Sequence, residues 1–250
     1  KRLKLYVSFV AQNLNFIENN QITIYKIIVK ILLINPITRP KGVKKDRTGV
    51  NYPMGIGYVG AYLEEQGHEV TIFDNNQKCL NKKELTEYFQ SINVDLVGIS
   101  SMANTYNQVL QLCILIKKVL KCPIIMGGAL PTYSAKTVLE NMKVDVCVLG
   151  EGEETAGDLL ENWNDYKDVD GIAYLDENKN YIQTPHRIPM QSRDDYPYPG
   201  YDNLIDISKY YRGINIEDIY NTLSSDYYHS IKNIRWLIFE LKINNKLNLI

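Results

Sequence analysis

The sequence predicts a doubly wound α/β domain built on a parallel sheet, and three observations carry this prediction. Apolar β-branched runs alternate with amphipathic helical segments through residues 27–163, which is the pattern of repeated β-α units. The first run, residues 27–35, is apolar almost without a break, as expected of a strand covered on both faces. Two later runs end in glycine-rich turns, at Gly127-Gly128 and at Gly150-Glu151-Gly152, where the backbone can be approached closely.

The periodicity gives five strands and five helices in alternation. We expect strands at residues 27–35, 68–74, 95–100, 124–126 and 144–149. We expect helices at residues 54–66, 82–92, 104–120, 135–142 and 153–163. Pro53 marks the start of the first helix and Gly67 its end. Because crossovers are right-handed, a flavodoxin-like (Rossmann-like) order is the natural choice for five such strands.

Changes in composition define the expected domain organisation. Residues 1–24 are rich in asparagine and form a poorly specified extension, and residues 25–167 form the α/β domain. Residues 168–212 contain a small β-hairpin (171–175 and 181–184) followed by a proline-rich linker, and residues 213–250 form an irregular or helical tail. A long polar loop at residues 36–52 carries five basic residues and is either a solvated surface loop or a cover for a ligand.

The composition disfavours several classes of function. The formal net charge is −1, from 28 basic and 29 acidic residues, so no basic excess points to nucleic acid. No apolar run reaches the roughly 18 residues that a membrane-spanning helix needs. Four cysteines without paired spacing indicate a reducing, cytoplasmic setting rather than a disulfide framework. None of the three histidines has partners at metal-ligand spacing, so we expect no protein metal ligand.

One motif suggests a dinucleotide site. Gly55-Ile-Gly57-Tyr-Val-Gly60 matches the Gly-x-Gly-x-x-Gly fingerprint, and Asp74 ends the next strand, where a ribose-binding acid falls. In that fingerprint the glycines form the turn directly after the first strand. Here Pro53 places them inside the first helix, after a long loop. A nucleotide-dependent oxidoreductase is therefore the weaker alternative.

Five motifs in a fixed order point elsewhere. They are Asn35-Pro36, the stretch from Pro53 to Val70, Gly98-Ile-Ser-Ser-Met-Ala-Asn-Thr, Gly127-Gly-Ala-Leu-Pro-Thr and Gly150-Glu-Gly-Glu-Glu-Thr. Together they resemble the N-terminal cobalamin-binding domain of cobalamin-dependent radical S-adenosylmethionine enzymes. The resemblance covers about residues 27–212 and includes the hairpin and the linker.

The resemblance implies that a corrin ring lies over the C-terminal edge of the sheet. Small hydroxyls after the third strand would meet the amide fringe or the nucleotide tail, the Gly-Gly turn would form the floor, and the turn around Glu151 the neighbouring wall. The implied cofactor-binding residues are Ser100, Ser101, Asn104, Thr105, Gly127, Gly128, Ala129, Leu130, Thr132, Gly150, Glu151 and Gly152. No catalytic residue is expected.

Three departures from the family pattern shape the functional expectation. No histidine lies between Asn35 and Gly67, so we expect cobalamin without a protein histidine as lower axial ligand, and Leu130 stands where relatives often carry histidine. No cysteine follows Cys147, so a [4Fe-4S] cluster and S-adenosylmethionine are expected only in full-length relatives. We expect a truncated corrinoid-binding module, not catalytic by itself, with a possible partner chain that carries the barrel. A ligand-free remnant or interaction domain of the same fold is the alternative.

Overall fold

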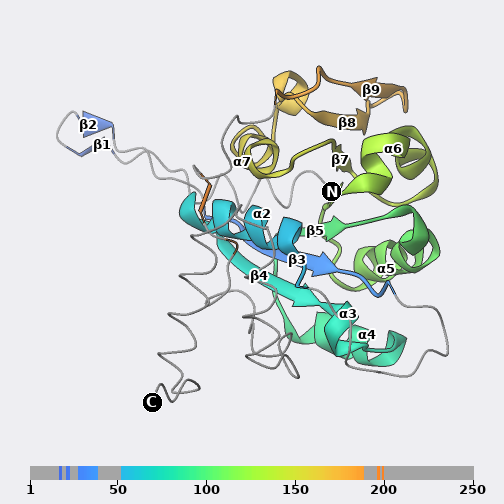
Figure 1. The fold of residues 1–250 in the computed structure, drawn as a ribbon. Helices are drawn as coiled ribbons and strands as arrows, with labels where there is room; N and C mark the ends of the chain where they lie inside the picture. Colours follow the sequence, from blue (N-terminus) through green and yellow to red (C-terminus); the bar gives the residue numbers. More distant parts are fainter. Residues whose placement is uncertain are drawn as a thin grey trace, which may run out of the picture. The chain divides into compact units, whose positions relative to one another are not determined.

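The computed structural model describes residues 28–38 and 52–188, residues 196, 197 and 199, and the short backbone pieces 17–18 and 21–22. Its central feature is a seven-stranded sheet in the order β4-β3-β5-β6-β7-β8-β9 (Figure 1). The first five strands of this order are mutually parallel. They are β3 (Lys30–Asn35), β4 (Glu69–Asp74), β5 (Leu96–Ser100), β6 (Ile124–Gly127) and β7 (Val146–Val148). In chain order this is 2-1-3-4-5, so the predicted flavodoxin-like topology is confirmed.

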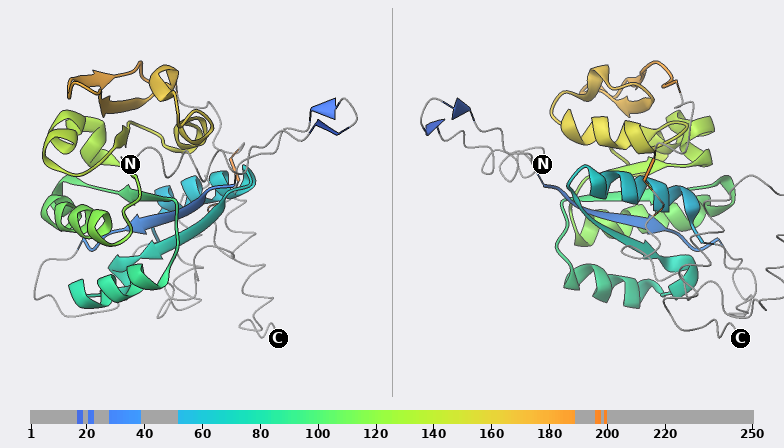
Figure 2. Two further views of the ribbon diagram at one scale, coloured as in Figure 1. Left: turned by 180° about the vertical axis from the view of Figure 1, so that it is seen from behind. Right: turned by 60° about the vertical axis from the view of Figure 1, so that its left-hand side comes forward.

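Helices cover both faces of the sheet (Figure 2). On one face lie α2 (Met54–Glu65) and α7 (Glu153–Glu161), and on the other α4 (Lys82–Ser91), α5 (Tyr106–Val119) and α6 (Ala129–Asn141). Successive residues of β3 point to opposite faces, so Leu33 joins one core cluster with Leu63, while Leu32 joins the other with Ile116. The strand that is apolar almost without a break in the sequence therefore contributes side chains to both core clusters.

The chain supplies its own helix-end signals. α2 begins directly after Pro53 and ends before Gly67, whose φ of +85° lets its N–H bond to the Glu64 carbonyl at 2.8 Å. α4 begins with a capping box, in which the Asn81 side chain accepts from helix N–H groups and the Glu84 side chain accepts from the Asn81 N–H. These local signals explain why both helices begin where the sequence predicts.

The hairpin is continuous with the main sheet, which the sequence did not reveal. β8 (Ile172–Leu175) pairs antiparallel with β7, and β9 (Tyr181–Gln183) pairs antiparallel with β8. β9 therefore runs in the same direction as β7, and the chain leaves β9 at the edge where the parallel strands end. The expected five-stranded sheet is thus extended by two antiparallel strands.

Two helical segments differ from the prediction. α6 begins at Ala129 rather than at residue 135, with non-helical backbone at Ser134 (φ −145°, ψ 34°) inside it. Pro131 is tolerated because the N–H groups of the first turn of a helix need no intrahelical partner. The short helix α3 (Asn75–Lys78) was not predicted and is capped by Asp74, which accepts from two backbone N–H groups. Two 3-10 turns are also present: η1 (Ala103–Thr105) lies between β5 and α5, and η2 (Tyr166–Asp168) lies between α7 and β8.

Several predicted segments lie outside the described residues. These are the extension 1–24 apart from β1 (Ile17–Glu18) and β2 (Gln21–Ile22), which pair antiparallel, most of the loop 36–52, most of the linker, and the tail 213–250. Within the described part of the chain, no helix combines the length and the apolar character that crossing a membrane requires.

Candidate functional site

The turns after β5, β6 and β7 lie side by side at the carboxyl edge of the sheet, and those after β6 and β7 are rich in glycine. Ser100 at the end of β5 is paired in register with Gly127 at the end of β6. One residue further on, Ser101 donates its N–H to the Gly127 carbonyl at 2.9 Å and its hydroxyl to the same oxygen at 3.1 Å. The Ser101 carbonyl in turn accepts from the Leu130 N–H at 3.1 Å. Three hydrogen bonds therefore join the turn after β5 to the turn after β6.

Position 128 needs glycine because a side chain there would overlap the backbone of Ser101. Its φ is +92°, and a Cβ built on it would lie 2.6 Å from the Ser101 carbonyl oxygen and 3.0 Å from the Ser101 nitrogen. The close approach that the sequence indicated is therefore made here by the neighbouring turn. Gly127 differs, because the nearest atom to a Cβ at that position would be Val148 Cβ at 4.0 Å.

Thr132 joins the second turn to the third. Its hydroxyl donates to the Gly128 carbonyl at 2.9 Å and accepts from the Gly150 N–H at 3.0 Å. A single hydroxyl thereby fixes the start of α6 against the turn that precedes α7. The Thr132 hydroxyl already donates one hydrogen bond and accepts another within the protein, so its role at this edge is to hold the two turns together.

The third turn is the most open of the three. Gly150 has a φ of +72°, and nothing lies within 4 Å of the position its Cβ would take. Glu151 follows with an exposed side chain. Gly152 packs more closely, because its Cβ would lie 3.3 Å from a methyl group of Val59 in α2. The turn therefore presents backbone and one carboxylate at the edge of the sheet, while its last glycine lets α7 approach α2.

The remaining predicted residues divide into exposed and internal ones. Asn104 and Ala129 are exposed at the edge, and Ser100 is partly buried. Thr105 is 1% exposed, and its hydroxyl donates to the Met102 carbonyl at 2.7 Å and accepts from the Met102 N–H at 3.1 Å. Leu130 is 7% exposed and belongs to the core cluster under α4, α5 and α6. The side chains of Thr105 and Leu130 thus stabilise the turns from inside.

The dinucleotide motif occupies a different setting from the one its fingerprint requires. Gly55, Gly57 and Gly60 all lie inside α2, as the position of Pro53 indicated. Asp74 is buried, and its Oδ1 accepts from Asn35 Nδ2 at 2.9 Å as well as from the first backbone N–H groups of α3. The carboxylate that would bind a ribose therefore serves as a helix cap and as a link between the ends of β3 and β4.

A small pocket lies next to the third turn and includes residues that the sequence analysis missed. Its volume is about 170 Å³. The lining residues are Leu149, Gly150, Glu151, Glu154, His186, Arg187 and Tyr196. Three of the lining residues, His186, Arg187 and Tyr196, come from the segment after β9, which the sequence suggested was a linker. The Pro185 carbonyl accepts from the Gly171 N–H at 2.7 Å, so this segment is fixed beside the start of β8.

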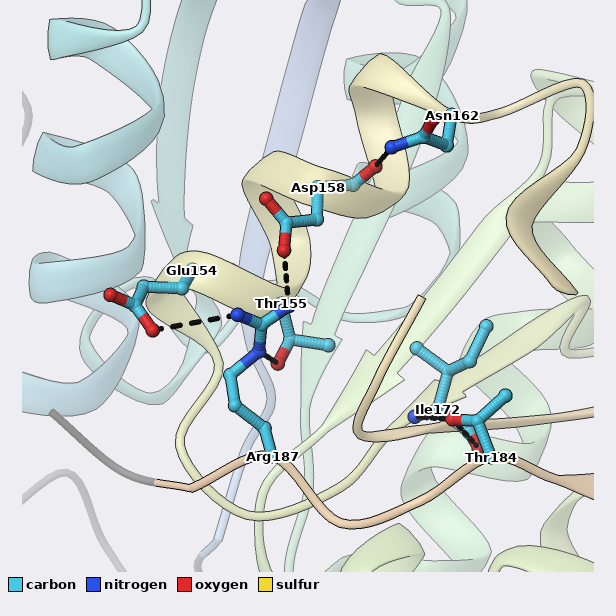
Figure 3. Close-up of polar contacts among 7 residues, drawn as sticks. All are labelled: Glu154, Thr155, Asp158, Asn162, Ile172, Thr184 and Arg187. Atoms are coloured by element: carbon cyan, nitrogen blue, oxygen red, sulfur yellow. Dashed lines mark hydrogen bonds and ion pairs between the residues drawn. The ribbon is translucent and has the colours of Figure 1, made fainter. Parts of the chain in front are cut away.

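Arg187 holds the segment after β9 against α7. Figure 3 shows its guanidinium between Glu154 and Asp158. Arg187 Nε donates to the Thr155 hydroxyl at 2.9 Å, one terminal nitrogen lies 3.5 Å from Glu154 Oε2, and the other binds Asp158. Charge-assisted contacts of this kind are stronger than neutral hydrogen bonds. No local pattern could have identified them, because the partners are 29 to 33 positions apart in the chain.

Several carboxylates lie near the Tyr196 phenol, which lines the pocket. Burial is the largest cause that raises the pKa of this phenol to about 12, and the Glu154, Glu153 and Glu151 carboxylates act in the same direction. The Tyr196 ring meets that of Tyr62 edge to face, with centroids 5.9 Å apart. Since even the ordinary pKa of a tyrosine lies well above 7, the phenol is protonated at neutral pH and carries an O–H donor.

The described residues contain no cluster of three or more histidine, cysteine, aspartate or glutamate side chains arranged to hold a metal ion. His68 is buried at the opposite, amino edge of the sheet, where its Nδ1 accepts from the Val29 N–H at 3.3 Å. His186 is exposed beside the pocket. The polar groups present at this edge, which are backbone groups, hydroxyls and the Glu151 carboxylate, are able to form hydrogen bonds with a polar ligand.

Comparison with known proteins finds one family model and several relatives. Residues 40–160 match the family model described as the B12 binding domain. An anaerobic magnesium-protoporphyrin IX monomethyl ester cyclase from Synechocystis is 31% identical over 189 residues, which is 73% of this chain and 37% of that protein. A methyltransferase from Pyrococcus horikoshii, itself uncharacterized, is 27% identical over 187 residues, covering 73% of this chain and 40% of that protein.

A solved structure shows the same fold. The cobalamin-dependent S-adenosylmethionine radical enzyme OxsB, in a structure with aqua-cobalamin bound, superposes with a TM-score of 0.61 at 18% identity. The match covers 84% of this chain and 31% of that one. This chain therefore spans well under half the length of the relatives it matches.

Proposed function

From the match of residues 40–160 to the B12 binding domain family model, we propose that the chain is a corrinoid-binding module whose site is the carboxyl edge of β5, β6 and β7. The observation that carries the proposal is that the three turns at that edge are hydrogen-bonded to one another through Ser101 and Thr132. A flat, amide-rich ligand needs a broad surface with exposed backbone groups, and the turn at Gly150 offers such a surface.

The predicted site residues take different roles in this proposal. Asn104, Ala129, Gly150 and Glu151 are exposed or open at the edge and would contact the ligand directly. The internal members hold these contacts in place. They are Ser101, Thr105, Gly128, Leu130 and Thr132, whose side chains or backbone are already engaged within the protein. Ser100, Gly127 and Gly152 form the partly buried floor between the two groups.

Exposed apolar side chains at the same edge favour a ligand that excludes water. Met102, in the turn after β5, is 53% exposed, and Tyr133, in the first turns of α6, is 86% exposed. Covering such groups with the face of a ring stabilises the complex by roughly 25 cal/mol per Å² of apolar surface removed from water. Cobalamin, when bound, supplies the cobalt chemistry, and the role of this chain is to orient it and to shield one side from solvent.

We infer that the segment after β3 supplies no histidine as lower axial ligand. The sequence has no histidine between Asn35 and Gly67, the segment that would carry one. His68 lies at the opposite edge of the sheet and is occupied by the Val29 N–H. We therefore infer that the corrinoid is held through its periphery rather than through a protein ligand to cobalt.

The catalytic steps of the relatives need groups that these 250 residues do not contain. A [4Fe-4S] cluster of the radical S-adenosylmethionine type needs three closely spaced cysteines, and no cysteine follows Cys147. We infer that the cluster and S-adenosylmethionine are bound by a barrel outside this sequence, with a partner chain as one source. The four cysteines, Cys79, Cys113, Cys122 and Cys147, are all free, which supports a reducing, cytoplasmic setting.

Gel filtration after incubation with hydroxocobalamin tests the proposal. The purified chain, mixed with the corrinoid at micromolar concentration, is expected to elute with an equimolar amount of the ligand, seen in the visible spectrum. A ligand-free remnant of the same fold would elute colourless, and that result would contradict the proposal. Excess NADH in the sample serves as a control, because a dinucleotide site at Gly55–Gly60 would bind it, whereas the carboxyl edge is not expected to.

A further inference from the structure

Tyr196 and Pro199, which follow β9 in the chain, are held against α2. The Tyr196 ring meets that of Tyr62 edge to face, with centroids 5.9 Å apart. Tyr62 itself packs on α7, because a Cβ at Gly157 would lie 2.9 Å from its Cε1 atom. Pro199 is buried, and its carbonyl accepts from the Tyr52 hydroxyl at 2.8 Å. Ring contacts and hydrogen bonds between distant parts of the chain therefore fix the position of the Tyr196 side chain.

Gly57, the second glycine of the dinucleotide-like motif, makes room for this arrangement. A Cβ at this position would lie 2.9 Å from the Tyr52 hydroxyl oxygen and 3.1 Å from Pro199 Cβ. Any side chain on Gly57 must therefore displace one or both of these residues. Gly55, in the same helix, has nothing within 4 Å of the position its Cβ would take. The motif thus contains one glycine that seats the segment carrying Tyr196 and one that does not.

Tyr196 lies beside the third turn of the proposed site. It lines the same pocket as Gly150, and the volume of that pocket is about 170 Å³. Sites that enclose a drug-sized molecule have roughly 300–1,000 Å³, so this pocket suits one peripheral group of a larger ligand. Nothing lies within 4 Å of the position of a Cβ on Gly150, so a ring that covers this turn can extend a side group to Tyr196.

The Tyr196 side chain suits the periphery of a corrin. Its ring offers apolar surface, and its phenol, which is protonated at neutral pH, carries an O–H donor. A corrin bears amide side chains around its rim. Their carbonyl oxygens accept hydrogen bonds, and their methylene groups can pack on an aromatic ring.

Resting on the proposed function, we propose that Tyr196 contacts a peripheral amide side chain of the corrinoid, and that Tyr62 and Gly57 position it for this contact. Tyr196 is the residue that touches the ligand, whereas Tyr62 and Gly57 act through it. The ligand site thus combines the carboxyl edge of the parallel sheet with the segment that follows β9.

Titration with hydroxocobalamin, followed in the visible spectrum, tests the contact. Tyr196→Ala should bind at least tenfold more weakly than the wild-type chain, because the ring and the donor are both lost, and Tyr196→Phe should lie between the two. Tyr166→Ala is the matched control and should bind as the wild-type chain does. The Tyr166 ring also forms an edge-to-face pair, with Tyr174 at 5.0 Å, but Tyr174 pairs with Val146 at the start of β7 and so lies at the amino edge.

Nitration of tyrosines with tetranitromethane, mapped by mass spectrometry, separates a contact from a purely structural role. Saturating hydroxocobalamin should slow the nitration of Tyr196 severalfold and leave that of Tyr166 unchanged.

Substitutions in α2 test the positioning. Gly57→Val should weaken binding of hydroxocobalamin severalfold, because the new side chain displaces Pro199 or Tyr52, whereas Gly55→Val should bind as the wild-type chain does. Tyr62→Leu, which removes the ring pair, tests the positioning a second time and should also bind more weakly. Circular dichroism confirms that each variant is folded.

Each contrary outcome has a separate meaning. If the wild-type chain does not bind hydroxocobalamin, the proposed function fails and this inference falls with it. If it binds, but Tyr196→Ala binds equally well and Tyr196 is not protected, the inference is wrong while the corrinoid site stands. If Tyr196→Ala binds weakly but nitration of Tyr196 is not slowed, the residue acts through the fold and the contact is refuted. If the folded Gly57→Val and Tyr62→Leu variants bind as tightly as Gly55→Val, the positioning role is refuted.

Discussion

At the scale of single residues, the two glycines of the Gly127-Gly128 turn do different things. Gly128 sits at φ +92° with the Ser101 backbone where its side chain would be, whereas Gly127 has room for a Cβ. The sequence predicted a close approach at this pair, but it could not say that the approaching group is the chain's own Ser101. That contact depends on the pairing of β5 with β6, which no local pattern encodes.

Because Gly128 has no room for a side chain and Gly127 has, alanine substitutions at the two positions should differ in their effect on stability. Gly128→Ala should lower the free energy of unfolding by about 2 kcal/mol or more, from left-handed backbone strain and overlap with Ser101. Gly127→Ala should change it by less than about 1 kcal/mol. Urea unfolding followed by circular dichroism measures both, and equal stabilities for the two variants would contradict the geometry.

Thr132 offers a second test at the residue scale. Thr132→Val keeps the shape of the side chain but removes the hydroxyl that bonds both the Gly128 carbonyl and the Gly150 N–H. We expect a loss of about 1–3 kcal/mol in unfolding free energy, because two polar groups lose their partner. Thr132→Ser, which retains the hydroxyl, should recover most of that loss. If Thr132→Ser is as unstable as Thr132→Val, the bridge is not what stabilises the two turns.

At the scale of elements, the hairpin and the segment after it complete the edge of the sheet. The two strands of the hairpin were predicted correctly from two short runs joined by a polar connection, and the prolines and charges after residue 184 indicated a linker. The structure ties that segment down through Arg187 and through the Gly171 N–H. These contacts join residues far apart in the sequence, so composition alone could not show how residues 185–188 are held.

Removing the Arg187 side chain should free this segment without unfolding the sheet. In Arg187→Met the bonds to Thr155, Glu154 and Asp158 are lost, and amide hydrogen exchange at Gly171 should accelerate about tenfold or more, since about 1–2 kcal/mol of local stability is lost. Lys167→Met is the control, because that lysine forms only an exposed ion pair with Asp165. Unchanged exchange at Gly171 in Arg187→Met would contradict the role assigned to the arginine.

At the scale of the whole molecule, the topology was predictable because the alternation of strands and helices repeats five times along the sequence. Five apolar strands alternate with five helices, and the rule of right-handed crossovers leaves few orders for them. Both core clusters follow from the two faces of strands such as β3. Two non-predicted features depend on contacts between distant segments, namely the extension of the sheet by β8 and β9 and the early start of α6 at Ala129. The short helix α3 was also missed, although its cap at Asp74 is local.

The buried thiols predict how global stability depends on pH. Burial raises the pKa of Cys113 and of Cys147 from 9.0 to about 12, and that of Cys122 to about 11. Above about pH 9 the unfolded chain loses these protons while the folded chain keeps them, so stability should fall as the pH rises, by up to about 1.4 kcal/mol per pH unit for each thiol.

Urea unfolding at pH 7, 9 and 10.5 measures this dependence. The unfolding free energy should be nearly constant up to about pH 8.5 and then decline. A Cys113→Ala, Cys147→Ala double variant should show a shallower decline, although it starts from a lower stability because it leaves two small cavities. Equal slopes for the double variant and the wild-type chain would show that these two thiols do not carry the effect.

The central claim, that a corrinoid lies on the carboxyl edge of β5, β6 and β7, is tested most directly by blocking that edge. Ala129→Trp places a large side chain at an exposed position where α6 begins, and Thr137→Trp places the same side chain on an exposed position about two turns further along the helix. The account predicts that Ala129→Trp binds hydroxocobalamin at least tenfold more weakly than the wild-type chain, while Thr137→Trp binds it equally well. Equal affinity in all three proteins would contradict the claim and place the ligand elsewhere on the molecule.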